Sequence, residues 1–176
     1  MRPHPKDRPS LDAAALIAAL EAHGVRWLLA GSYVLKLYGA GITPNDLDVV
    51  LDRDPANLHR AAECLEALEA VPQWVGDPKW DVGTVEDHLA WRPWPADIVH
   101  LDQLFVTHHG MLDLPFALVP PYDTLLPGSV VMQVEGFDVT VCDPRRVLRA
   151  LETRNRKKDA QRAPIYAEMR RRFGLD

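Results

Sequence analysis

The stretch LLAGSYVLKLYGAGITPNDLDVVLD, residues 28–52, carries the strongest structural and chemical signals in the chain. It joins a hydrophobic run, a Gly-Ser step, an amphipathic segment, a turn and a second hydrophobic run that begins with Asp46 and Asp48. Side chains two residues apart on a strand share one face and lie roughly 6–7 Å apart. Two carboxylates placed in this way repel each other, and the fold alone gains nothing from them. We therefore expect a positive group, such as a divalent cation, between Asp46 and Asp48.

The composition indicates one globular domain. The 176 residues are 47% hydrophobic and 26% charged, which is enough for a single core. Cys64 and Cys142 form no spacing motif, which favours reduced thiols in a cytoplasmic protein. No segment holds the ~20 apolar residues that cross a bilayer, and the polar, proline-rich start has no apolar signal segment. We expect a single domain over residues 1–176, with a flexible N-terminus over residues 1–9.

The charge is unevenly distributed along the chain. The formal net charge is −5, but residues 144–176 contain eleven Lys and Arg against four Asp and Glu. This basic C-terminal segment either faces a polyanion such as RNA or is the solvated surface of two helices. The sequence leaves both interpretations open, because the whole chain is not basic enough to indicate nucleic-acid binding from charge alone.

Local signals predict most helices and strands of the first half. Ser10 can cap a helix that ends at Gly24, and a short buried strand follows over residues 25–30. A two-turn helix then reaches Gly39, and residues 46–52 form a strand. Asp54 and the following proline begin a helix with an apolar face over residues 54–71.

The second half is predicted less regularly. Residues 72–95 are expected to be irregular, and residues 96–106 and 110–119 to form strands. Residues 129–143 alternate and turn at Glu135-Gly136, which predicts a hairpin. Helices are expected over residues 144–153 and 159–173, the second either continuous or restarted at Pro164. The fold class is therefore α/β (α+β), a mixed sheet with flanking helices.

Asp113 is the candidate for a third carboxylate. It lies between Leu112 and Leu114 in GMLDLPF, so on a strand its side chain points away from both leucines. Mg²⁺ prefers carboxylate oxygens and substrate phosphates. Three carboxylates on neighbouring strands can hold two such ions for an in-line phosphoryl displacement.

The Gly31-Ser32 step is a candidate anion site. It follows a strand and opens a helix, where backbone N–H groups can bind a phosphate. Taken alone, the step is more often a tight turn in which Ser32 caps the helix. Its place fourteen residues before Asp46 favours the functional interpretation.

Together these motifs resemble the nucleotidyltransferase superfamily that shares the DNA polymerase β palm. Its pattern is a hydrophobic residue with Gly-Gly or Gly-Ser, then two acidic residues one apart, then a third acidic residue on a later strand. The sequence is most similar to the AbiEii-like toxin–antitoxin nucleotidyltransferases, through GS, DLDV, GMLDLPF and the basic RNRKKDAQ before the last helix. The resemblance covers most of the chain, from about Val25 to Phe173.

The resemblance implies an enzyme that transfers a nucleoside monophosphate from an NTP, such as ATP, to a hydroxyl of tRNA or protein. It also implies a cognate antitoxin. Asp46 and Asp48 would bind Mg²⁺, and Asp113 would complete the metal site and act as base. Residues that would bind the nucleotide are Gly31, Ser32, Arg156 and Lys158, while Asp159 would hold the basic pair or cap the helix. The chain departs from the pattern at Ile42 and Pro44, where relatives often carry Arg and Thr.

Other signals leave alternatives open. The fold could be a catalytically inactive binding module, or the acceptor a small molecule such as an aminoglycoside. Four histidines match no zinc spacing and are expected to be ordinary surface or core residues: His88, His100, His108 and His109. Four tryptophans are expected in the core, with base stacking as the alternative: Trp74, Trp80, Trp91 and Trp94.

Overall fold

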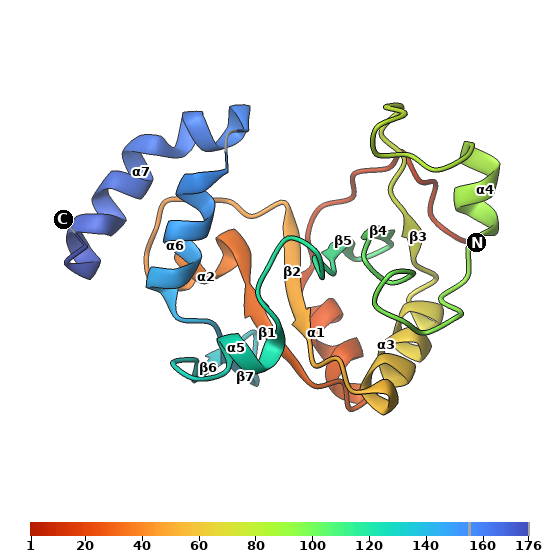
Figure 1. The fold of residues 1–176 in the computed structure, drawn as a ribbon, viewed down its shortest axis with the longest axis horizontal. Coiled ribbons are helices and arrows are strands. Elements are labelled where there is room, and N and C mark those ends of the chain that lie inside the picture. Colours follow the sequence, from red (N-terminus) through yellow and green to blue (C-terminus); the bar gives the residue numbers. More distant parts are fainter. Residues whose placement is uncertain (155, 176) are drawn as a thin grey trace.

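A mixed seven-stranded sheet flanked by helices forms the protein (Figure 1). The computed structural model describes residues 1–154 and 156–175. Within them the strand order is β3-β4-β5-β2-β1-β7-β6. The strands are β1 (Trp27–Ala30), β2 (Asp46–Leu51), β3 (Val71–Pro72), β4 (Leu104–Thr107), β5 (Gly110–Asp113), β6 (Val130–Val134) and β7 (Phe137–Val141). The helices are α1 (Ala13–Ala22), α2 (Gly31–Leu37), α3 (Pro55–Ala67), α4 (Val85–Ala90), α5 (Tyr122–Leu125), α6 (Pro144–Thr153) and α7 (Lys157–Phe173).

Strand β2 lies at the centre of the sheet. It pairs antiparallel with β1, placing Ala30 opposite Asp48, and parallel with β5, placing Asp48 opposite Asp113. The central strands are buried on both faces of the sheet, and their side chains include several buried leucines. The register therefore brings residues from three separate segments of the chain to one point.

Short capping motifs explain several helix starts. Asp54 accepts a hydrogen bond from the backbone N–H of Ala56, and Pro55 takes the first position of α3. Asp143 and Pro144 begin α6 in the same way. The first backbone N–H groups of a helix have no partner within the helix. The Asp carboxylate accepts a hydrogen bond from one of them, and Pro has no N–H that needs a partner, so this pair favours a helix start. The predictions that α3 begins at Pro55 and that α6 spans residues 144–153 are confirmed.

The hairpin predicted from alternation is also confirmed. Strands β6 and β7 pair antiparallel around Glu135 and Gly136, which both have positive φ angles, 50° and 86°. Two consecutive residues of this kind form the turn whose twist matches a two-residue hairpin. Glu135 is thereby held at the tip of the hairpin.

Three predictions in the first part of the chain are wrong. The helix predicted over residues 54–71 ends at Ala67, and Val71 belongs to β3. Helix α1 is capped by Asp12, which accepts a hydrogen bond from the N–H of Ala15, and not by Ser10. The segment predicted as irregular contains α4, which begins with a capping box between Thr84 and Asp87. Surrounding Trp and Pro residues obscured this short local signal.

Two predicted strands are shorter in the structure. The first half of the segment 96–106 turns instead, because the Asp97 carboxylate accepts hydrogen bonds from the N–H groups of Val99 and His100. Strand β5 stops at Asp113, two residues before Pro115, which has no N–H to continue the ladder. The third carboxylate therefore lies at the very end of its strand.

The last helix begins at Lys157 and continues through Pro164. The alternative of a restart at this proline is wrong, since Tyr166 and Met169 beyond it are buried and hold the second half in line. Helix α7 packs on α6, and α6 packs on α2. In Figure 1, α7 forms one end of the molecule and α4 the opposite end.

The prediction that four tryptophans lie in the core is wrong. Trp80 is 68% exposed and Trp94 is 39% exposed, and only Trp91 packs on the core, against Phe105. The buried tryptophan is Trp27. Residues 72–103, which carry the four, form the rim of the molecule around α4 and not its centre.

Residues 1–9, predicted to be a flexible N-terminus, lie along this rim with defined contacts. Arg2 donates to the carbonyl groups of Leu89 and Trp91, and the N–H of Trp74 donates to Pro5. In the part of the chain that the structure describes, no helix is long and apolar enough to span a membrane.

Candidate active site

Three aspartates lie near one another where β2 and β5 run side by side. Asp48 and Asp113 are direct neighbours in the parallel register, and Asp46 lies two residues earlier on β2. Asp48 is buried, whereas Asp46 and Asp113 are partly exposed. The structure thus brings together the three carboxylates that the sequence singles out.

These carboxylates perturb one another. Burial raises the pKa of Asp48 well above its usual range, and the charges of Asp46 and Asp113 raise it further. Burial also raises the pKa of Asp113 to about 7, with the charge of Asp46 as the next cause, while a hydrogen bond with Asp48 lowers it. Both pKa values are raised mainly by burial and further by neighbouring carboxylates, so the ionised forms of Asp48 and Asp113 are disfavoured in this site.

Gly31 makes room for this cluster. Its φ is +66°, a left-handed conformation, and a Cβ atom built on it would lie 1.8 Å from Oδ2 of Asp48. No side chain fits at this position, because the Asp48 carboxylate packs directly on the Gly31 backbone. The requirement for glycine therefore comes in part from the carboxylate, a neighbour that the sequence does not reveal.

Ser32 is buried as the second residue of α2. The residue at the helix cap is Ala30, and no side chain caps the helix. The alternative that Ser32 acts as the capping residue is therefore wrong. Its backbone directly follows Gly31, on which the Asp48 carboxylate packs.

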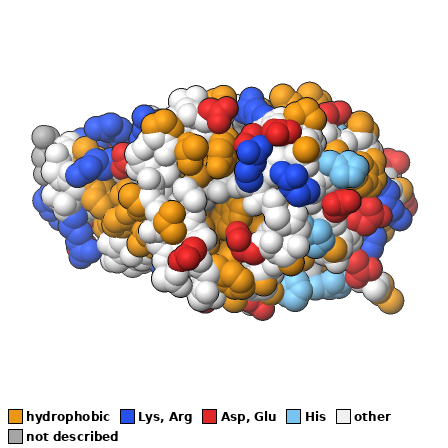
Figure 2. Space-filling model, turned by 90° about the horizontal axis from the view of Figure 1, so that it is seen from below, with side chains coloured by type: hydrophobic (Ala, Val, Ile, Leu, Met, Phe, Trp, Pro, Cys, Tyr) orange, Lys and Arg blue, Asp and Glu red, His pale blue; other side chains and the backbone are white. Residues whose placement is uncertain are grey.

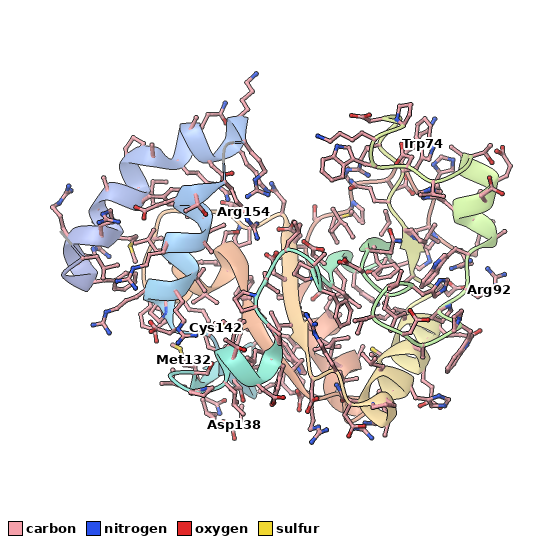
Figure 3. All side chains as sticks on the ribbon, in the orientation of Figure 1. Trp74, Arg92, Met132, Asp138, Cys142 and Arg154 are labelled. Carbon is pink, nitrogen blue, oxygen red and sulfur yellow. The ribbon has the colours of Figure 1, made fainter. Side chains whose placement is uncertain are left out.

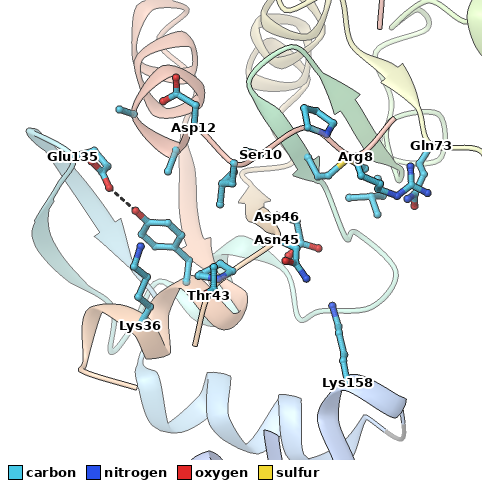
Figure 4. Close-up of a pocket in the computed structure, with 18 residues that line it drawn as sticks. Arg8, Ser10, Asp12, Lys36, Thr43, Asn45, Asp46, Gln73, Glu135 and Lys158 are labelled. Atoms are coloured by element: carbon cyan, nitrogen blue, oxygen red, sulfur yellow. Dashed lines mark hydrogen bonds between the residues drawn. The ribbon is translucent and has the colours of Figure 1, made fainter. Parts of the chain in front are cut away.

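Two basic side chains face the carboxylates. The charges of Arg154 and Lys158 both lower the pKa of Asp48, and Arg154 also lowers that of Asp113. Arg154 directly follows the last residue of α6 (Figure 3), and Lys158 extends from α7 toward Asp46 (Figure 4). Arg154 was missed as a site residue in the sequence, since only the packing of α6 on α2 brings it there.

Arg156 has a different partner. Its guanidinium donates to both oxygens of Asp159, over 2.6 and 3.1 Å, and the Tyr166 hydroxyl donates to the same carboxylate. The Asp159 side chain is only 4% exposed. The expectation that Asp159 holds a basic residue is confirmed for Arg156, which leaves Lys158 directed at the cleft.

A cleft of about 980 Å³ opens beside Asp46. Its walls come from the N-terminal segment 8–14, α2, the turn before β2, and Lys158 (Figure 4). The hydroxyl of Tyr33 donates to the carboxylate of Glu135 across 2.7 Å, which ties α2 to the tip of the hairpin at the far wall. Both charged and apolar groups line the cleft, so it can accept a large polar molecule.

The donors suit a hard divalent cation such as Mg²⁺. Asp48 and Asp113 provide carboxylates that are adjacent in the sheet, and carboxylate oxygens are ligands that Mg²⁺ prefers. Within residues 1–154 and 156–175, however, no three His, Cys, Asp or Glu side chains converge closely enough to hold a metal ion. The donor chemistry fits such a cation, although the carboxylates do not converge around one point as they stand.

Comparison of the chain with models of known protein families, with curated proteins and with solved structures gave no match.

Proposed function

We propose that this chain is a Mg²⁺-dependent nucleotidyltransferase with the corresponding fold, similar to toxin–antitoxin enzymes and acting in the cytoplasm. It transfers a nucleoside monophosphate from an NTP to an acceptor hydroxyl and releases pyrophosphate. One observation carries the proposal: Asp48 and Asp113 lie side by side in register, Asp48 packs on Gly31, and Asp46 is on the same strand as Asp48.

The carboxylates have distinct roles in this proposal. Asp46, Asp48 and Asp113 hold Mg²⁺, which when bound supplies positive charge for the phosphates and for the oxygens that attack and leave. Asp113 also takes the proton of the acceptor hydroxyl as its oxygen attacks the α-phosphorus.

The neighbouring groups bind the triphosphate. Lys158 and Arg154 already face the carboxylates. Their positive charges stabilise the negative charge that develops on the departing pyrophosphate. The backbone at Gly31 and Ser32 lies beside the same point and adds N–H donors. Arg156 contributes through its pair with Asp159, which fixes the first turn of α7 and therefore the position of Lys158.

The proposed acceptor is the hydroxyl of a tRNA or of a protein. Lys and Arg side chains gather at the end of the molecule formed by α7 (Figure 2), which favours RNA slightly. If this surface binds RNA, counterion release makes the affinity fall steeply with salt. An affinity that does not change with salt would favour a protein, such as a partner encoded with it, or a small molecule such as an aminoglycoside.

Incubation with each of the four labelled NTPs, Mg²⁺ and total tRNA or protein tests the proposal. We expect label in one acceptor class with the intact chain and none with Asp48→Asn. Asp138→Asn, on the hairpin away from the site (Figure 3), is the matched control and should transfer normally. If no nucleotide is transferred to tRNA or protein, nor to an aminoglycoside in a parallel incubation, the enzymatic proposal fails.

A second candidate is a non-catalytic module that binds a nucleotide or a partner without turnover. Two observations favour it: three carboxylates do not converge among the described residues, and the turn before β2 carries Ile42 and Pro44. Such a module would bind a labelled NTP with similar affinity in the intact chain and in Asp48→Asn, and neither protein would release pyrophosphate.

A further inference from the structure

A second hollow, of about 570 Å³, lies at the α4 end of the molecule. Its walls come from β3, α4 and the loop that leads into β4. Strand β3 is at the edge of the sheet, with β4 and β5 between it and β2. The hollow is therefore separate from the three aspartates. The residues that line it and are used below are Trp80, Val82, Asp87, Trp91, Asp97, Val99 and His100.

Large apolar side chains are unusually exposed around this hollow. Val82 is 90% exposed, Val99 is 81% exposed and Trp80 is 68% exposed. Single exposed hydrophobic residues are common on protein surfaces, but a group of them beside a hollow marks an interaction site. The surrounding segment is long and irregular, and loops of this kind often carry binding residues.

The charge at the hollow is negative. Residues 75–103 contain six acidic and two basic side chains, and none of the described lining residues is Lys or Arg. Asp87 is held in place by Thr84, whose N–H and hydroxyl donate to its carboxylate, and these bonds lower its pKa. Asp97 accepts two backbone N–H groups. Both carboxylates are therefore fixed in position.

Aromatic rings complete the lining. The rings of Trp91 and His100 are stacked, with centroids 5.0 Å apart and planes inclined by 15°. His100 is fixed by a hydrogen bond from its ring to the carbonyl of Arg92. Trp80 is largely exposed, and the ammonium group of Lys79 lies 4.9 Å from its ring centroid, so one face of this ring already carries a cation. Aromatic faces with nearby carboxylates bind organic cations.

We propose that this hollow docks a segment of a partner protein in which an arginine or lysine side chain lies between apolar residues. The cation enters between Trp80 and the carboxylates of Asp87 and Asp97. The flanking apolar residues cover Val82 and Val99. The negative charge disfavours nucleic acids and anionic lipids, whose phosphates would be repelled.

Fluorescence anisotropy with synthetic peptides tests this docking site. The probe is a fluorescein-labelled peptide with one arginine between leucines. In the control peptide this arginine is replaced by citrulline, which has nearly the same shape but no charge. We expect the arginine peptide to bind about tenfold more tightly, since both the aromatic and the carboxylate contacts depend on that charge.

Two variants locate the binding. Trp80→Leu removes an exposed ring, and Asp97→Asn removes a charge but keeps an oxygen for the two N–H groups; each should weaken arginine-peptide binding at least about fivefold. Trp74→Leu, outside the hollow, is the matched control. In the intact protein, the indole N–H signal of Trp80 should shift on peptide addition, whereas that of the buried Trp27 should stay.

Three results would overturn the docking site. The two peptides could bind equally, Trp80→Leu could bind normally, or Asp48→Asn could abolish binding and so place it at the aspartates. If sedimentation instead shows a dimer that Trp80→Leu dissociates, the occupant is a second copy of the chain and the partner segment is rejected. None of these outcomes bears on nucleotide transfer.

Discussion

The carboxylate of Asp48 lies directly on the backbone of Gly31. A Cβ atom at residue 31 would come within 1.8 Å of Asp48 Oδ2 and 2.8 Å of its Cβ. Atoms cannot approach this closely, and neither partner can yield easily, because Asp48 is buried in the central strand of the sheet. The turn after β1 and the central carboxylate are thus a single structural unit.

Gly31→Ala should therefore be strongly destabilising. We expect a loss of more than about 2 kcal/mol in the free energy of unfolding, from the contact with Asp48 and from the left-handed backbone. Gly24→Ala is the matched control, since its φ is +62° and its nearest neighbour would be 3.8 Å away. It should lose only about 1 kcal/mol. If chemical denaturation shows the same loss of unfolding free energy for Gly31→Ala and Gly24→Ala, the contact with Asp48 does not contribute.

Asp48→Asn should separate activity from stability. Transfer should fall at least about a hundredfold, because a bound metal ion contributes several kcal/mol to the transition state. Without Mg²⁺ the free energy of unfolding should stay the same or rise by about 1 kcal/mol, since repulsion with Asp46 and Asp113 is removed. Denaturation in EDTA and an activity assay measure the two effects. A large loss of stability would mean that Asp48 is a structural residue.

The raised pKa of Asp113 predicts a dependence of stability on pH. Between about pH 4 and pH 7 the folded state keeps a proton on Asp113 that the unfolded state has lost, so stability decreases as pH rises through this range. Asp113→Asn should remove part of this decrease, leaving the part due to Asp48. Denaturation of both proteins in EDTA at about pH 5 and about pH 7.5 measures it. If the free energies of unfolding of the two proteins differ by the same amount at both pH values, the raised pKa of Asp113 is contradicted.

Arg156 and Lys158 should differ in what they lose. Arg156→Ala leaves the buried Asp159 without its ion-pair partner and should cost about 1–3 kcal/mol in unfolding free energy. Lys158→Ala should leave stability nearly unchanged and weaken NTP binding, because its side chain lines the cleft. Thermal unfolding and a nucleotide titration distinguish them. The reverse pattern would exchange the roles of the two residues.

Local sequence signals account for much of the fold. The pairs Asp54-Pro55 and Asp143-Pro144 fix their helix starts, and Glu135-Gly136 fixes the hairpin, because each signal acts within a few residues. The i and i+2 spacing places Asp46 and Asp48 on one face without any knowledge of the rest of the chain.

Features that depend on distant segments could not be predicted in this way. Arg154 becomes a neighbour of Asp113 only through the packing of α6, and Arg156 turns to Asp159 because Tyr166 and burial fix that carboxylate. The exposed tryptophans around α4 were assigned to the core because composition alone does not show that their segment lies at the edge of the sheet. Tertiary packing overrides local preference at such positions.

The central claim is that Asp46, Asp48 and Asp113 together hold divalent cations at the phosphates of an NTP. A crystal grown with Mn²⁺ and a non-hydrolysable NTP analogue tests it through the anomalous signal of the manganese. We predict a peak bound by Asp48 and Asp113, with Asp46 turned toward it and a phosphate beside Gly31. Manganese bound elsewhere, or an analogue bound with its phosphates away from these three carboxylates, would contradict the account.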